Sequence, residues 1–277
     1  AKFCSTLAKF GIESTVVKPG DKDALVAAIR PETRLLFTES PTNPHLHVLD
    51  LEFLVAFARE RRLKLLIDST LATPMNQRPL DFGVDLVIHS ATKYMGGHND
   101  LMAGVVCGSG PLVDAIREYQ RITGAIVDPN TSYLLIRGLK TLALRVERQN
   151  ETALAVARYL EGHPRIRRVY YPGLESHVDY EIAREQMRGF GGLISFEIDG
   201  DLEKTRDFVN GLALPYIAPS LGGVETLVSH PATISYYDLG EEERLAIGIS
   251  DQLVRYSVGI EESSELIQDL ERGLNKL

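Results

Sequence analysis

Residues 84–104 read VDLVIHSATKYMGGHNDLMAG, and this stretch decides the fold that the rest of the sequence predicts. Residues 85–88 are a short apolar run with β-branched side chains, which is typical of a strand buried in a parallel sheet. The apolar character ends abruptly at His89-Ser90-Ala91-Thr92-Lys93. Because ligands bind at the carboxyl edge of open α/β sheets, we expect this polar segment to lie at that edge. The glycines that follow allow the backbone to turn sharply.

Lys93 is the side chain of this stretch that most directly suggests chemistry. A lysine buried beside glycines and hydroxyls has a lowered pKa, so its amine carries a free lone pair and acts as a nucleophile. Alternatively, Lys93 is an ordinary lysine at a strand end whose ammonium group reaches water, as in most lysines. The residue by itself does not separate these two interpretations.

Upstream of this stretch, short apolar runs alternate with amphipathic segments. Helices are expected at residues 1–10, 24–29 and 49–59, and strands at residues 12–17, 34–38, 63–67 and 85–88. This alternation predicts an α/β fold with a doubly wound, mostly parallel sheet. Asn43, Asp68 and Lys93 each lie in a polar cluster that follows one of these strands. If the strands are parallel, the three residues lie along one edge of the sheet.

The second half of the sequence has a different pattern. A helix is expected at residues 111–121 and a long one from a cap at Asn130 toward residue 160. Strands are expected at residues 167–171, 193–198 and 253–258, and helices at residues 180–186, 202–212 and 263–275. This mixture predicts a smaller α+β domain. We place the domain boundary near Lys140, giving a large domain of residues 1–140 and a C-terminal domain of residues 141–277.

Composition and motifs exclude several classes of protein. A net charge of −8 and a pI near 5.5 argue against a surface that binds nucleic acid or an anionic membrane. Cys4 and Cys107 are the only cysteines, too few for a disulfide framework or a zinc cluster. No histidines have metal-ligand spacing, and no Walker A loop, GxSxG motif or GxGxxG after a strand is present. No apolar run reaches the roughly 18 residues that span a bilayer.

Four residues near the predicted sheet edge suit a phosphate-bearing aldehyde cofactor. The hydroxyls of Ser90 and Thr92, beside backbone N–H groups, would bind the phosphate. The amine of Lys93 would form a Schiff base with the aldehyde. Asp68 would keep a ring nitrogen protonated, the usual arrangement for pyridoxal phosphate. Alone, Asp68 would be interpreted as a turn or cap residue, but together with Lys93 and the hydroxyls it favours a cofactor site.

Three further positions have two interpretations each. Asn43 lies between prolines and either holds its amide in a fixed direction or simply forms a turn. Arg255 alternates with apolar residues in an expected strand, where it either reaches the rim of the sheet or binds a carboxylate through two hydrogen bonds. Ser220 opens a loop of sequence SLGG, which either approaches a ligand or is a surface turn. His45 and His47 are expected to be exposed.

In this order, these segments resemble the Cys/Met-metabolism (trans-sulfuration) family of pyridoxal-phosphate enzymes. The matching segments are ESPTNP at residues 39–44, DST at 68–70, SATKY at 90–94, GHND at 97–100, RGLKTL at 137–142, SLGG at 220–223 and LVR at 253–255. The resemblance covers essentially the whole chain. Residues 96–100 (GGHND) and 217–220 (IAPS) are most similar to the plant-type cystathionine γ-synthase branch of the family.

The resemblance implies a PLP-transferase fold of type I and a role for each candidate residue. Lys93 would be catalytic, holding pyridoxal 5′-phosphate as a Schiff base and then moving protons on the substrate. The residues implied to bind the cofactor are Asp68, Thr70, Ser90 and Thr92. The residues implied to hold the substrate carboxylate and the cofactor region are Asn43, Ser220 and Arg255.

The resemblance also implies an activity and an assembly. The activity is γ-replacement, which condenses an activated homoserine ester with cysteine to cystathionine during methionine biosynthesis. The implied assembly is a homotetramer, a dimer of dimers with shared active sites, in the cytoplasm or, for a plant-type source, in a plastid. The implied partners are small amino-acid substrates, not nucleic acid or a membrane. The alternatives are a γ-lyase, an O-acylhomoserine sulfhydrylase, a catalytically silent truncated chain, or a doubly wound binding protein without the cofactor.

Two departures from the family pattern affect these expectations. Many members have Glu before the serine of the SLGG loop, where this chain has Pro219. Members also carry an upstream segment with a ring-stacking tyrosine, a phosphate loop and a Tyr/Arg pair that reaches the neighbouring subunit. Because the chain opens at Ala1 without a methionine, we expect a fold that is incomplete at its N-terminus.

Overall fold

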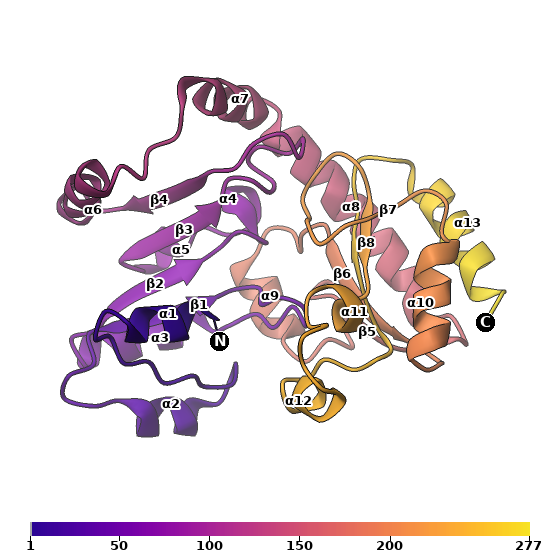
Figure 1. Cartoon of the computed structure of the whole chain (residues 1–277), viewed down its shortest axis with the longest axis horizontal. Helices are drawn as coiled ribbons and strands as arrows, with labels where there is room; N and C mark the ends of the chain where they lie inside the picture. The colour runs from indigo at the N-terminus through magenta and orange to yellow at the C-terminus, as the bar shows by residue number, and fades with distance from the viewer. Residues whose placement is uncertain (1) are drawn as a thin grey trace.

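The computed structural model describes residues 2–277, which form two sheets surrounded by helices (Figure 1). One sheet is built from the N-terminal half of the chain and the other from the C-terminal half. The long helix α8 (Leu142–Glu161) leads from the first half into the second. This combination of sheets and helices confirms the predicted α/β class.

The first sheet contains β1 (Leu35–Glu39), β2 (Lys64–Asp68), β3 (Leu86–Ser90) and β4 (Gly104–Gly108), in that spatial order. β1, β2 and β3 are parallel, and β4 runs antiparallel to β3. The three parallel strands therefore end at one edge of the sheet, as the sequence predicts. The sequence does not predict β4, because glycines at both its ends are typical of turns rather than strands.

Helices of the N-terminal half surround this sheet. They are α1 (Lys2–Ala8), α2 (Lys22–Ala28), α3 (Leu51–Glu60), α4 (Thr73–Asn76), α5 (Pro79–Phe82), α6 (Gly110–Thr123) and α7 (Pro129–Leu139). α3 begins at Asp50, whose side chain accepts a hydrogen bond from the backbone N–H of Phe53 (2.9 Å). The core between α3 and the sheet contains Leu51, Leu54, Val55, Phe57, Leu65, Ile67 and Val87. This packing fixes β2, which ends at Asp68, and β3, which precedes Lys93.

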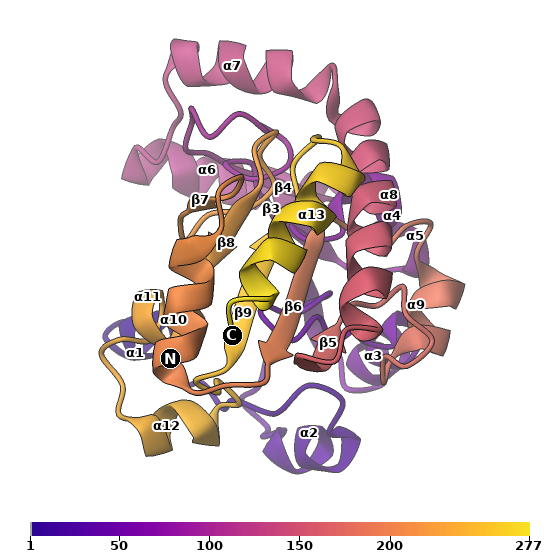
Figure 2. The same cartoon turned by 90° about the vertical axis from the view of Figure 1, so that its right-hand side faces the viewer.

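The second sheet has the spatial order β5 (Ile166–Tyr170), β6 (Leu193–Ile198), β9 (Leu253–Ser257), β8 (Leu227–Ser229), β7 (Tyr216–Ile217). Its helices are α8, α9 (Tyr180–Gln186), α10 (Leu202–Gly211), α11 (Pro231–Ile234), α12 (Glu241–Ala246) and α13 (Ser263–Leu274). Figures 1 and 2 show α8, α10 and α13 on the face of this sheet that is turned away from the first sheet. The opposite face is turned toward the first sheet.

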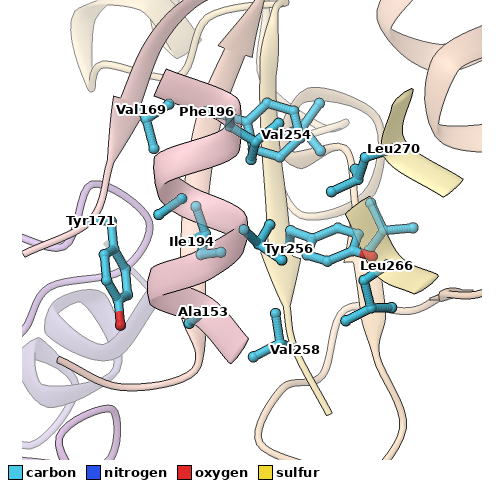
Figure 3. Close-up of a cluster of buried hydrophobic side chains, with 14 of the residues drawn as sticks. Ala153, Val169, Tyr171, Ile194, Phe196, Val254, Tyr256, Val258, Leu266 and Leu270 are labelled. Atoms are coloured by element: carbon cyan, nitrogen blue, oxygen red, sulfur yellow. The ribbon is translucent and has the colours of Figure 1, made fainter. Parts of the chain in front are cut away.

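Residues of β9 alternate between these two faces. Val254 and Tyr256 lie in the hydrophobic core under α8 and α13, together with Phe196 of β6 (Figure 3). Arg255 and Ser257 therefore point to the other face, toward the first sheet. This confirms the alternation that the sequence predicts for residues 253–258.

Tyr256 provides a test of this core. It is 0 % exposed, and its hydroxyl has no hydrogen-bond partner among the described residues. Because an unpaired buried hydroxyl destabilises the fold, we expect Tyr256→Phe to raise the free energy of unfolding by about 1 kcal/mol in denaturant titrations. The matched control is Tyr171→Phe, which removes a hydrogen bond donated to the carbonyl of Gly191 (3.0 Å) and should lower this free energy by about 1 kcal/mol. An equal decrease in the free energy of unfolding in both variants would contradict the prediction.

Two predicted elements differ from the structure. No strand forms at residues 12–17; Ile12 and Val16 are 50 % and 78 % exposed, and no described strand pairs with this segment. The long helix expected from Asn130 toward residue 160 is two helices, α7 and α8, which meet at residues 140–141. The residue that caps the N-terminus of α7 is Asp128 rather than Asn130, because the Asp128 carboxylate accepts the hydrogen bond of the Asn130 N–H (2.8 Å). The expected helix at residues 1–10 corresponds to α1, and residue 1 lies outside the described residues.

His45 and His47 are half-buried, so the prediction that they are exposed is wrong. The ring of His45 packs edge-on against Tyr170 at a centroid distance of 5.0 Å. Nδ1 of His47 lies 2.9 Å from a carboxylate oxygen of Asp179. Both partners belong to the second half of the chain, which explains why the local sequence does not reveal the burial.

No helix among residues 2–277 is long and apolar enough to cross a membrane.

Each sheet has a hydrophobic core of its own, on which we base the proposal that residues 1–140 and 141–277 are separate domains.

Candidate active site

The candidate site begins at the carboxyl end of β3, where the chain turns immediately. The backbone N–H of Lys93 donates to the Ser90 carbonyl (3.1 Å), and that of Gly97 donates to the Lys93 carbonyl (2.7 Å). Gly97 adopts φ +74°, a conformation that favours glycine. These hydrogen bonds define a tight turn, residues 90–97, which we call the lysine turn. It directs Lys93 away from the strand and toward the second half of the chain.

Lys93 is half-buried and contacts the SLGG loop. Its Nζ donates a hydrogen bond to the hydroxyl of Ser220 (2.8 Å). Burial lowers the pKa of the Lys93 amine, and the nearby positive charge of Arg255 lowers this pKa further. A larger fraction of this amine than of an ordinary lysine is therefore unprotonated at a given pH, which is the state required of a nucleophile.

Asp68 ends β2, directly beside β3. Its Oδ1 accepts hydrogen bonds from the backbone N–H (2.9 Å) and the hydroxyl (2.6 Å) of Thr70. The Thr70 hydroxyl in turn accepts a hydrogen bond from the backbone N–H of Ser90 (2.7 Å), the first residue of the lysine turn. Oδ2 of Asp68 accepts no hydrogen bond from a described residue. Thr70 thus orients the carboxylate and leaves one of its oxygens open to a ligand.

Ser90 and Thr92 differ in how their hydroxyls are engaged. The Ser90 hydroxyl has no hydrogen-bond partner among the described residues. The Thr92 hydroxyl accepts from the backbone N–H of Ala103 (3.1 Å) and lies 3.4 Å from the carbonyl of the same residue. Thr92 therefore ties the lysine turn to the start of β4, while Ser90 remains open to bind a phosphate.

Arg255 and Ser257 of β9 hold the SLGG loop. Arg255 is 7 % exposed, and its Nη2 donates to the carbonyls of Pro219 (2.6 Å) and Ser220 (3.1 Å). The Ser257 hydroxyl accepts from the backbone N–H of Gly222 (3.0 Å). Nε and Nη1 of Arg255 make no hydrogen bond to a described residue, so the guanidinium can bind a carboxylate as well as position the loop. The burial of Arg255 and its contacts with the loop do not agree with a side chain that reaches water at the rim, and the binding of a carboxylate stays a prediction.

Asn43 makes no side-chain hydrogen bond to the other predicted site residues. It is exposed, and its side-chain amide makes no hydrogen bond to a described residue. Its backbone N–H donates to Oε1 of Glu39 (2.9 Å). Glu39 and Asp68 are register partners on β1 and β2, and burial followed by the charge of Asp68 raises the pKa of Glu39. Glu39 therefore lies at the same sheet edge as Asp68, a position that its place at the end of a predicted strand indicates, but it was not among the predicted site residues.

Pyridoxal phosphate fits the groups that converge here. Its aldehyde requires an amine with a lowered pKa, its ring nitrogen a carboxylate, and its phosphate neutral donors. Lys93, the open oxygen of Asp68 and the open hydroxyl of Ser90 match these three requirements, and all lie at the ends of β2 and β3. No group of acidic, histidine or cysteine side chains among residues 2–277 could hold a metal ion.

The fold and this set of side chains define a pyridoxal-phosphate-dependent enzyme of the α/β class. The sequence profile of the Cys/Met metabolism PLP-dependent enzyme family matches residues 1–275, and the chain therefore belongs to this family.

Similar proteins of known function support the assignment. The chain is 51 % identical over 272 residues to cystathionine gamma-synthase 1, chloroplastic, of Arabidopsis thaliana, covering 98 % of this chain and 48 % of that protein. It is 45 % identical over 280 residues to L-methionine gamma-lyase of Fusobacterium nucleatum subsp. polymorphum, covering 100 % of this chain and 71 % of the relative. The chain thus spans about half the length of the Arabidopsis thaliana protein and of the chloroplastic cystathionine gamma-synthase 1 of Nicotiana tabacum.

A solved structure has the same fold. The crystal structure of cystathionine gamma-lyase from Lactobacillus plantarum, complexed with L-serine, superposes with a TM-score of 0.93 at 40 % sequence identity. The match covers 99 % of this chain and 72 % of that one. The predicted PLP-transferase fold is thereby confirmed.

Proposed function

We propose that this protein catalyses γ-replacement, condensing an activated homoserine ester with cysteine to form cystathionine. The observation that carries the proposal is the hydrogen bond from Lys93 to Ser220, which joins an amine of lowered pKa to the loop that Arg255 of β9 holds. Asp68 ends the neighbouring strand β2. The relatives named cystathionine gamma-synthase, at 51 % and 50 % identity, favour this member of the family's reactions.

Each site residue has a defined task in this reaction. Bound pyridoxal phosphate supplies an electron sink that stabilises negative charge developing on the substrate. Lys93 would take the proton from Cα of the homoserine ester, release it, and then take one from Cβ, so that the γ-substituent leaves with its bonding electron pair. After the cysteine thiolate has attacked Cγ, Lys93 would return protons to Cβ and Cα. Asp68 would keep the ring nitrogen protonated and Ser90 would hold the phosphate. Thr92 accepts from the N–H of Ala103 and would donate its own O–H to the phosphate. Arg255 holds the substrate carboxylate, and Ser220 orients the Lys93 amine.

Product analysis separates this reaction from its closest alternatives. The purified protein, supplied with pyridoxal phosphate and an O-acylhomoserine, is incubated with cysteine, with sulfide, or without a thiol. Cystathionine from the cysteine reaction supports γ-replacement. Homocysteine formed only with sulfide would indicate a sulfhydrylase, and release of an oxo acid from cystathionine or methionine without a thiol would indicate a γ-lyase, the activity named for several relatives. A colourless protein that yields none of these would support the silent alternative.

Arg255 provides a test of substrate binding. We expect Arg255→Ala to raise the KM for the homoserine ester by roughly 10- to 100-fold, because a charge-assisted hydrogen bond contributes about 1.5–3 kcal/mol. The variant also removes the positive charge that lowers the Lys93 pKa, so the acidic limb of the pH–rate profile should move to higher pH. Steady-state kinetics over a pH series measures both effects. An unchanged KM would remove Arg255 from the substrate site.

We further propose a homotetramer, a dimer of dimers with shared active sites, acting on small amino-acid substrates in the cytoplasm or in a plastid. The resemblance to the family supports the assembly, and the chloroplastic relatives support the plastid alternative. Sedimentation of the purified protein tests the assembly directly.

A further inference from the structure

Arg145 of α8 contacts the lysine turn. Its side chain is buried, with 5 % of the residue exposed, and each of its donor groups has a different hydrogen-bond partner. Nη1 donates to the carbonyl of Tyr94 (2.7 Å), Nη2 to the carbonyl of Gly138 (2.8 Å), and Nε to the hydroxyl of Thr141 (3.0 Å). No carboxylate pairs with Arg145 among residues 2–277.

A buried guanidinium that has no carboxylate partner is unfavourable, so its presence at this position calls for an explanation. Burying a charge is unfavourable unless hydrogen bonds replace the lost water, and an apolar side chain would fill the same volume without that penalty. Burial lowers the pKa of Arg145, the direction expected for such a desolvated cation. All three hydrogen bonds go to neutral oxygens of the lysine turn and of residues 138–141. The side chain therefore connects two segments of backbone that are far apart in the sequence.

Two glycines leave the space that the Arg145 guanidinium and the neighbouring backbone occupy. At Gly97 a Cβ atom would lie 2.1 Å from Nη1 of Arg145, so any side chain there would displace the guanidinium. At Gly138 a Cβ atom would lie 2.4 Å from the carbonyl oxygen of Gly96. The lysine turn and the end of α7 thus approach each other with only backbone and the Arg145 guanidinium between them.

This connection determines where Lys93 reaches the SLGG loop. Tyr94, whose carbonyl Arg145 binds, follows Lys93 directly, and the N–H of Gly97 donates to the Lys93 carbonyl. The carbonyl of Gly97 accepts from the N–H of Val224, just beyond the SLGG loop (3.0 Å). A shift of the turn would therefore change the Nζ–Oγ contact between Lys93 and Ser220. We propose that Arg145 is a positioning residue, which holds the lysine turn so that the Lys93 amine meets Ser220 inside the site.

This inference rests on the proposed function only in that Lys93 is the reacting amine. Its test therefore begins with the protein free of cofactor. Competitive acetylation over a pH series, followed by peptide mass spectrometry, gives the pKa of Lys93 itself. We expect Arg145→Gln to raise this pKa toward the ordinary lysine value of about 10.4, because a displaced amine becomes hydrated. Arg145→Lys, which keeps the charge and one or two donors, should give an intermediate pKa.

A matched control is available on the same helix. Arg148, less than one turn away, is paired with Glu262 and donates to the Glu261 carbonyl, and it makes no hydrogen bond to the lysine turn among the described residues. Arg148→Gln should leave the Lys93 pKa and the affinity for added pyridoxal phosphate unchanged. Arg145→Gln should weaken that affinity, measured by absorbance titration, roughly 10- to 100-fold, the range known for outer-shell partners of metal ligands.

A double-mutant cycle shows whether Arg145 acts through the turn. Because Gly97→Ala already displaces the guanidinium, its effect on the Lys93 pKa should not add to that of Arg145→Gln. Additive effects, or a Lys93 pKa that stays as in the wild type in Arg145→Gln, would overturn the proposal. If Arg145→Gln does not fold, Arg145→Lys decides by the same pKa criterion. If the wild-type protein forms no cystathionine, the proposed function is refuted, but the pKa measurements on Lys93 can still be interpreted.

Discussion

Lys93→Ala is expected to reduce cystathionine formation by at least about 10⁴-fold while leaving the protein folded. General acid–base catalysis by one side chain contributes 10²- to 10⁴-fold, and this variant also loses the amine that attaches the cofactor covalently. The fold should survive, because the Lys93 amine is half-buried and makes one hydrogen bond, to Ser220. Steady-state turnover and far-UV circular dichroism measure the two parts of the prediction.

The control for Lys93→Ala is Lys204→Ala. Lys204 is an exposed lysine of α10, which lies on the face of the second sheet turned away from the first sheet, and its replacement should leave turnover unchanged. Borohydride reduction of the wild-type protein with bound pyridoxal phosphate provides a second readout, since it fixes the cofactor on the amine that holds it. Peptide mapping should find the label on Lys93. Label on another lysine, or turnover retained by Lys93→Ala, would refute the assignment.

The sequence predicts the edge at which this chemistry lies because the signal is local. β2 and β3 are apolar runs that end in a polar residue, and parallel strands necessarily bring such ends together. Asp68 and Lys93 can be placed on this argument alone. The role of Thr70, which links the Asp68 carboxylate to the backbone of Ser90, follows from the resemblance to the family and gains its geometry only from the structure.

Other features depend on contacts between distant segments, which no local pattern records. The division of residues 130–160 into α7 and α8 reflects the contact of Gly138 with the lysine turn, and Arg145 acquires partners only once that contact exists. β4 is stabilised by pairing with β3 rather than by its own composition. Thr92, predicted to bind phosphate, uses its hydroxyl to hold Ala103, and that engagement cannot be read from the SATKY segment.

Asp68→Ala should lower kcat by about 10²- to 10³-fold and weaken the binding of pyridoxal phosphate. The expected magnitude is that of removing one preorganised group that stabilises charge in a transition state. A carboxylate facing the ring nitrogen keeps that nitrogen protonated, and without it the ring withdraws electrons from the substrate less effectively. The absorbance spectrum of the bound cofactor and its dependence on pH report the protonation state independently of turnover.

Two variants determine whether the carboxylate itself is responsible. Asp81→Asn removes a carboxylate of α5 that pairs with Arg78 at an exposed site, and it should leave turnover and spectrum unchanged because exposed ion pairs contribute little. Thr70→Val keeps the Asp68 carboxylate but removes the hydroxyl that orients it, so its loss of kcat should be smaller than that of Asp68→Ala. If Asp68→Ala keeps the wild-type spectrum and rate, the ring nitrogen does not face β2. In that case the two neighbouring strand ends do not form one cofactor site, and the functional proposal built on their adjacency fails.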